Sequence, residues 1–230
     1  MTSPWIPPPP PSPPWGRSSL WGIVASVEVA LVVTTVILDL FIPSLILLML
    51  AACSLVLRRQ GPRSLGVLRP SPSSRMIAQV VALTLAWNVV MFLAVVPLLE
   101  FTTGTRRDVG GFAALQGDLA LLLFLLALTW TLAAVGEEFA FRGYLQTRMR
   151  ELLPGPLGFA VAILLSSVLF GWVHTEQGVV GVIVTTVDGI FFSVLRYRFR
   201  TLWASVVSHG VSNTAGIMVF FLFGPVHAPW

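Results

Sequence analysis

The sequence predicts an all-α fold, a polytopic bundle of transmembrane helices. Hydrophobic residues make up 56% of the 230-residue chain and charged residues only 10%. A soluble domain carries about 25% charged residues. The apolar excess is therefore larger than one soluble core could bury, and it must face lipid or other helices.

The first half of the chain predicts a tail followed by two spans. Residues 1–19 are rich in proline and are expected to form a disordered tail. Leu20–Leu57 is almost continuously apolar. As one helix it would be about 57 Å long, nearly twice the ~30 Å hydrocarbon thickness of a bilayer. We therefore expect it to cross twice, with a turn at Asp39–Pro43.

Five later apolar runs predict one span each, which brings the total to about seven. They are Met76–Leu99, Leu119–Val135, Leu157–Val173, Val179–Leu195 and Leu202–Phe223. These spans divide the chain into an N-terminal group of three at residues 20–117 and a core of four at residues 118–230.

The arginines predict the orientation. All 14 basic residues are arginines, and the net charge is +4. With a cytoplasmic N-terminus, twelve arginines lie in inner segments and only Arg106 and Arg107 lie outside. An excess of arginine is typical of cytoplasmic loops, so the N-terminus is predicted to be cytoplasmic. Since the arginines lie between apolar runs, where they set orientation, we do not expect nucleic acid as a partner.

The composition also bears on the location and on the lone cysteine. A chain without lysine that is rich in Ala, Gly, Pro and Val is typical of a GC-rich bacterial genome, so we expect a bacterial plasma membrane. Cys53 lies in an apolar run, where it is expected to serve as a small packing residue.

Ionisable and amide side chains within or beside the spans are candidate functional groups, because a charge inside a bilayer is costly. They fall in three segments, AVGEEFAFRGYLQ, SSVLFGWVH and VVSHGVSNTAG, and comprise Glu137, Glu138, Arg142, His174, His209 and Asn213. Nearby glycines, which would allow helix backbones to approach closely, are Gly136, Gly143, Gly171, Gly210 and Gly216.

The spacing separates two kinds of carboxylate. Glu138 and Arg142 are four residues apart, so on a helix they share a face and can pair. Glu137 is offset from that face by about 100° and is left free for other chemistry. Glu28 and Asp188 also lie in spans, but we expect each to be structural, and Asn88 is expected to form an interhelical hydrogen bond.

These segments resemble the motifs of the CAAX prenyl endopeptidase and bacteriocin-processing (CPBP) family of intramembrane proteases. Glu-Glu-x-x-x-Arg is matched by Glu137, Glu138 and Arg142; Phe-x-x-x-His by Phe170 and His174; His-x-x-x-Asn by His209 and Asn213. The resemblance covers roughly Ala133 to Ala215, so residues 118–230 would form the catalytic core.

The resemblance implies an endopeptidase that cleaves a membrane-associated protein or peptide, with the site open toward the cytoplasm. Glu137 would be the general base, and His174 would hold the attacking water. His209 and Asn213 would donate hydrogen bonds to the oxyanion. Glu138, Arg142 and Phe170 would play supporting structural roles.

Three alternatives stay open from the sequence. Glu137, His174 and His209 could instead bind Zn²⁺ and activate water on the metal, although the His-Glu-x-x-His helix of common zinc proteases is missing from the sequence. A non-catalytic scaffold or bacteriocin-immunity protein of the same fold is the second alternative. The third is a small proton-coupled transporter that uses these side chains as a relay.

Overall fold

The structure is a computed structural model that describes residues 19–67 and 73–225, and within these ranges every regular element is a helix. The α-helices are α1 (Ser19–Ile37), α2 (Pro43–Leu57), α3 (Ser74–Val90), α4 (Val96–Thr103), α5 (Leu119–Leu128), α6 (Gln146–Leu152), α7 (Pro156–Trp172), α8 (Gly178–Phe199) and α9 (Leu202–Phe223). Two π-helical segments, η2 (Met91–Val95) and η4 (Thr129–Leu145), join α3 to α4 and α5 to α6. Short 3₁₀ turns are η1 (Pro62–Leu65), η3 (Gly110–Leu115) and η5 (Thr175–Gln177).

Each of the seven predicted spans corresponds to an apolar helix, but the helices differ in length. Among the described residues, five helical stretches are long and apolar enough to cross a membrane: Leu20–Ile37, Ser74–Thr103, Leu119–Leu152, Thr175–Phe199 and Leu202–Phe223. The other two, α2 and α7, have 15 and 17 residues. The all-helical membrane class is therefore supported, whereas seven full crossings and a cytoplasmic N-terminus stay predictions. The predicted tail lies almost entirely outside the described residues.

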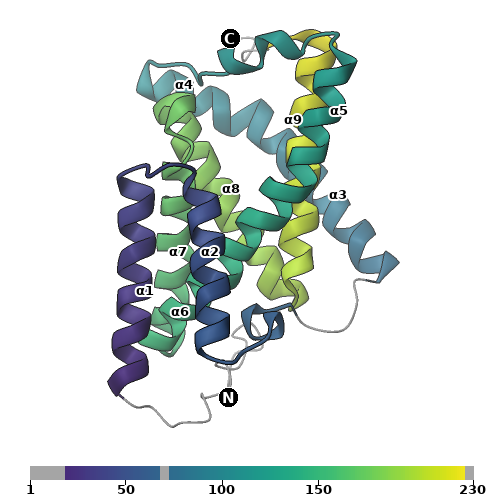
Figure 1. The fold of residues 1–230 in the computed structure, drawn as a ribbon. Helices are drawn as coiled ribbons and strands as arrows, with labels where there is room; N and C mark the ends of the chain where they lie inside the picture. The colour runs from purple at the N-terminus through teal and green to yellow at the C-terminus, as the bar shows by residue number, and fades with distance from the viewer. Residues whose placement is uncertain (1–18, 68–72, 226–230) are drawn as a thin grey trace.

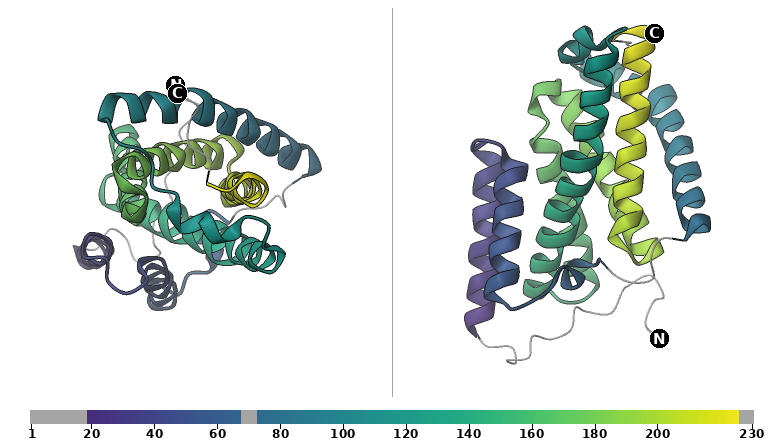
Figure 2. Two further views of the ribbon diagram at one scale, coloured as in Figure 1. Left: turned by 90° about the horizontal axis from the view of Figure 1, so that it is seen from above. Right: turned by 45° about the vertical axis from the view of Figure 1, so that its right-hand side comes forward.

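The α1–α2 hairpin and the α3–α4 segment lie on opposite sides of the molecule (Figure 1). α1 and α2 form a hairpin that packs on η4, α6 and α7. α3 and α4 form a long bent helix on the other side, packed against α9 and α8. Seen from above, α8 and α9 lie between this bent helix and the α5–η4–α6 helix (Figure 2). The helices that carry the three motifs are thus central.

Local sequence explains where several helices begin. Pro43 and Pro156 lie in the first turns of α2 and α7. Backbone N–H groups in a first turn have no partner within the helix, so proline, which lacks the N–H, costs no hydrogen bond there. The side chain of Asp118 accepts a hydrogen bond from the backbone N–H of Leu121 and caps α5. α7 and α8 pack closely at Gly171, since a Cβ atom there would lie 2.5 Å from the backbone oxygen of Val182.

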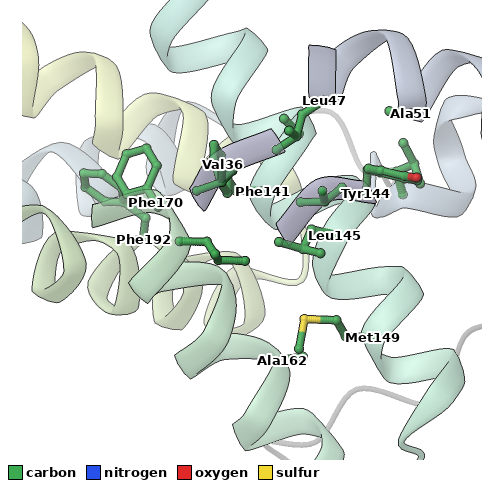
Figure 3. Packing of buried hydrophobic residues seen from close by; sticks show 14 residues of the cluster. Val36, Leu47, Ala51, Phe141, Tyr144, Leu145, Met149, Ala162, Phe170 and Phe192 are labelled. Carbon is green, nitrogen blue, oxygen red and sulfur yellow. The ribbon is translucent and has the colours of Figure 1, made fainter. Parts of the chain in front are cut away.

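The hydrophobic core lies where η4 meets α2, α7 and α8 (Figure 3). Phe141, Phe170 and Phe192 are all at most 2% exposed, and the Phe141 and Phe170 rings meet edge to face at 5.4 Å between centroids. Burial of such large rings is the main stabilising contribution in a packed interior. This core lies directly against the motif residues.

Several expectations about individual residues are wrong. Cys53 is exposed on the helix surface, so it is not a packing residue. A Cβ atom on Gly216 would meet no atom within 4 Å, so this glycine is not a site of close helix contact. Arg196 was expected to act as an orientation signal, but it is buried and donates to Gln146 and to the backbone oxygens of Arg142 and Leu65.

Candidate active site

Three separate parts of the chain contribute side chains to one cavity of about 820 Å³. Glu137 comes from η4, His174 follows the C-terminal end of α7, and His209 and Asn213 lie one turn apart on α9. All four line the cavity, together with Phe170. The structure therefore brings together every residue for which the sequence suggested a direct chemical role.

The two oxygens of Glu137 face different neighbours. Oε1 accepts a hydrogen bond of 3.1 Å from the hydroxyl of Ser44 on α2. Oε2 lies 3.9 Å from Nε2 of His209, which is too long for a direct hydrogen bond. The Glu137 side chain is 15% exposed, so it has access to the cavity without being a surface group.

Glu138 and Arg142 form the predicted ion pair, with 3.0 Å between Oε1 and NH1, and both side chains have no exposure. They lie four residues apart in η4, a π-helix with i→i+5 hydrogen bonds rather than the α-helix that the sequence predicted. Gly189 of α8 leaves room for the guanidinium, because a Cβ atom there would lie 2.8 Å from NH2 of Arg142. The pair therefore compensates its own charge inside the bundle.

The same carboxylate of Glu138 also holds His209. Nδ1 of the imidazole lies 3.0 Å from Oε1 of Glu138, and His209 is only 3% exposed. A carboxylate beside a cation is an acceptor, so Nδ1 carries a proton in this contact. Glu138 thus fixes the ring so that Nε2 faces the cavity and Glu137.

Aromatic rings enclose the imidazole and the guanidinium. Phe192 stacks on His209 with 5.1 Å between ring centroids and an angle of 17°. Phe170 meets His209 at 5.6 Å and His174 at 5.1 Å, both edge to face. The Arg142 guanidinium carbon lies 4.0 Å from the centroid of Phe170. Phe170 was expected only to pack, and it does so against three of the other motif residues.

The tautomer of His174 follows from its single backbone contact. Nδ1 lies 2.8 Å from the backbone oxygen of Phe170. Since a carbonyl oxygen can only accept, Nδ1 is the protonated nitrogen, and a neutral ring keeps its lone pair on Nε2. That nitrogen can accept a hydrogen bond from water in the cavity.

Polar contacts between α3, α8, α9 and η4 lie beside the cavity, which Asn88, Asp188 and Ser212 line. Ser212 donates to Asn88 at 2.9 Å, so the predicted interhelical role of Asn88 is confirmed. Trp87 donates from Nε1 to Asp188 at 2.8 Å, so the carboxylate that was expected to be structural has a hydrogen-bond partner on α3. Trp130 of η4 donates to Thr214, next to Asn213.

Two residues around the site, Ser44 and Arg107, gave no signal in the sequence. Ser44 is one of several serines in apolar runs, and nothing marks it as the partner of Glu137. Arg107 is one of the two outer arginines, yet it lines the cavity and donates to Gln177. Burial lowers the pKa of Arg107, and the carboxylates of Asp188, Glu176 and Glu100 act in the opposite direction.

The cavity extends from the motif residues toward one end of the bundle. Its lining there includes Arg107 and Phe112, which lie between α4 and α5, and Glu176, which lies before α8. Among the described residues, none from 138–169 or 193–208 lines it, so it does not reach the arginine-rich end. Figure 1 shows the segment between α4 and α5 at the end opposite α6.

This geometry bears on two predictions about orientation. The positive-inside pattern places residues 104–118 outside, while the site was expected to open toward the cytoplasm. Because the cavity opens beside that outer segment, the two predictions exclude each other. Both therefore stay predictions, of which only one can hold.

The residues proposed as zinc ligands do not form a metal site in this arrangement. In residues 19–67 and 73–225, no group of three or more His, Cys, Asp or Glu side chains is placed to hold a metal ion. The set Glu137, His174 and His209 therefore does not fit Zn²⁺ as the side chains lie here.

The fold and the cavity define a helical membrane protein with a buried carboxylate–histidine site. Residues 119–215 match the family model of the Rce1-like proteins, described as type II CAAX prenyl endopeptidase Rce1-like. This match confirms the family resemblance predicted from the three motifs, and it includes all seven motif residues. No curated protein and no solved structure matches the chain.

Proposed function

We propose that this protein is an intramembrane endopeptidase that hydrolyses a peptide bond in a membrane-associated protein or peptide. The observation that carries the proposal is the meeting of Glu137, His174 and His209, from three separate segments, around one cavity. A carboxylate and imidazoles in a largely apolar cavity are suited to general acid–base chemistry. The family of residues 119–215 supports a protease.

In the proposed reaction Glu137 is the general base. Its carboxylate removes a proton from a water molecule as the water oxygen attacks the scissile carbonyl carbon. Glu137 then returns the proton to the amide nitrogen as the C–N bond breaks. His174 holds the water through Nε2, because its Nδ1–H is already donated to Phe170.

His209 and Asn213 would stabilise the oxyanion that develops on the carbonyl oxygen. Both line the cavity on the same side of α9. Since the Nδ1 proton of His209 is directed at Glu138, the ring must carry a second proton, on Nε2, to donate to an oxyanion. The carboxylates of Glu137 and Glu138 both lie beside that form of the ring, 3.9 and 3.0 Å from its two nitrogens.

We further propose that the protein is an integral protein of a bacterial plasma membrane, with its N-terminus in the cytoplasm. The cavity then opens on the opposite side, beside residues 104–118 and 174–178. Substrate would reach Glu137 from that side or from the lipid, because exposed cavity-lining residues such as Val89 and Phe92 lie on the bent α3–α4 helix.

A transporter is disfavoured by the position of the polar groups. A proton or solute path must continue through the bilayer, whereas this cavity ends at the motif residues and takes no lining residue from 193–208. A scaffold or immunity protein would have the same fold but would cleave no substrate. The experiment below distinguishes this alternative from a protease.

The test compares membranes that contain the wild-type protein with membranes that contain Glu137→Gln. Quantitative proteomics should find at least one membrane protein or peptide that is cut in the first and accumulates uncut in the second. The matched control is Asp39→Asn, which makes the same chemical change at an exposed turn residue with φ 47°, a conformation that asparagine tolerates.

If wild type and Glu137→Gln give the same proteome while both are folded, the protein is a scaffold. The purified enzyme should also keep its activity toward the accumulated substrate in excess chelator, since we propose hydrolysis without a metal. Loss of activity that returns only on addition of Zn²⁺ would replace the general-base mechanism with a metal-dependent one.

A further inference from the structure

The N-terminal hairpin supplies a part of the site that lies outside the family segment. We propose that Ser44 is a positioning residue that holds the Glu137 carboxylate in its reactive orientation. The inference rests on the proposed function of Glu137. Ser44 belongs to α2, 93 residues before Glu137 in the sequence, whereas the family match begins at residue 119.

Ser44 contacts the Glu137 carboxylate on the side that faces away from the cavity. The Ser44 hydroxyl donates to Oε1 at 3.1 Å and is itself buried, with 7% exposure. Ser44 does not line the cavity that Glu137 and His209 share. A substrate in the cavity would therefore touch Glu137 and not Ser44, so any effect of Ser44 must act through the carboxylate.

A glutamate needs such a partner to have a defined orientation. The terminal torsion of a glutamate side chain is broad, so packing of the stem alone does not fix the direction of its two oxygens. With Oε1 held by Ser44, Oε2 is directed toward Nε2 of His209, 3.9 Å away. This is the oxygen that faces the place where water would be activated.

The packing of α2 on η4 sets the position of Ser44. One turn further along α2, Leu48 packs on Gly136, the residue before Glu137, where a Cβ atom would lie 3.2 Å from the leucine side chain. Leu47 is fully buried in the main core. The hydroxyl therefore reaches the carboxylate because the two helices approach closely at a glycine.

The test uses the substrate that accumulates in the Glu137→Gln membranes, cleaved by purified enzyme in liposomes. We expect Ser44→Ala to lower kcat by roughly tenfold, the size expected for loss of a hydrogen bond to a charged group, with KM unchanged. Ser44→Thr keeps the hydroxyl and should restore most of the activity. Ser26→Ala is the matched control, because the Ser26 hydroxyl is exposed and, among the described residues, bonds the backbone oxygen of Gly22 alone.

A second variant separates positioning from general damage to the fold. In the Glu137→Gln background, Ser44→Ala should cause no further loss of the residual rate. A rise in KM, a failure of Ser44→Thr to restore kcat, or an equal effect in both backgrounds would overturn the inference.

Infrared difference spectroscopy gives a readout that needs no substrate. The carboxylate stretching band should shift between wild type and Ser44→Ala, and this shift should vanish when the comparison is made in the Glu137→Gln background. If no band shifts, the hydrogen bond does not exist and the inference fails, even in an active enzyme. If wild type and Glu137→Gln cleave nothing, the proposed function fails, and the role of Ser44 fails with it.

Discussion

Glu138 connects the charges inside the bundle. Its Oε1 lies 3.0 Å from NH1 of Arg142 and 3.0 Å from Nδ1 of His209, and none of the three side chains is more than 4% exposed. A guanidinium enclosed in this way is tolerated only if its charge is compensated. The second glutamate of the motif therefore contributes to stability and to the orientation of His209 at the same time.

We predict that Glu138→Gln lowers both stability and activity. The change leaves the Arg142 charge without a counterion, for which a loss of about 3–5 kcal/mol is typical. Thermal unfolding of the purified protein should show a clearly lower Tm than that of Glu137→Gln, because Glu137 has cavity access and is not the carboxylate that contacts Arg142. Equal Tm values for the two variants would contradict this assignment.

At the scale of elements, the α1–α2 hairpin is attached to the core by an ion network at its arginine-rich end. Arg58, the residue that follows α2, lies 2.9 Å from Glu28 of α1 and 2.9 Å from Glu151 of α6. Arg148 of α6 contacts the same two carboxylates at 3.4 and 2.6 Å. Glu28, whose expected role was structural, thus joins three helices.

We predict that Arg58→Gln weakens the attachment of the hairpin. The substitution leaves Glu28 and Glu151 with Arg148 as their one arginine partner among the described residues. Because the Glu28 side chain is only 10% exposed, the free energy of unfolding should fall by about 3 kcal/mol. Arg59→Gln is the matched control, because Arg59 is the adjacent residue and is exposed. Limited proteolysis between α2 and α3 should become faster only in Arg58→Gln.

The sequence predicts the helices and the motif residues well, because both depend on local patterns. Apolar runs identify all seven apolar helices, and four-residue spacing correctly pairs Glu138 with Arg142. Ser44 and Arg107 escape prediction because their roles arise from contacts with residues far away in the sequence. The π-helical form of η4 also gives no clear pattern, since it depends on how the helix packs.

For the molecule as a whole, the cavity and the exposed arginines lie toward opposite ends of the bundle. Arg59, Arg63 and Arg198 are exposed at the end away from the cavity opening. The arginines that are buried in ion pairs, such as Arg142 and Arg148, contribute to the fold instead. The exposed ones are sufficient to favour a cytoplasmic location for that end.

We predict that the two ends can be distinguished with single cysteines in a Cys53→Ser background, which removes the exposed native thiol. A membrane-impermeant maleimide added to intact cells should label Thr105→Cys, in the exposed segment beside the opening. Arg63→Cys should react only after the cells are permeabilised. The reverse pattern would place the cavity opening in the cytoplasm.

The shortness of α2 and α7 has a consequence for the surrounding lipid. Helices of 15 and 17 residues span only about 22 and 26 Å, less than a ~30 Å hydrocarbon layer. Where these two helices cross the layer, the lipid beside them is expected to become thinner, or its headgroups to move inward. The membrane beside α2 and α7 is therefore expected to be thinner than elsewhere, and proteins with short transmembrane segments would collect there.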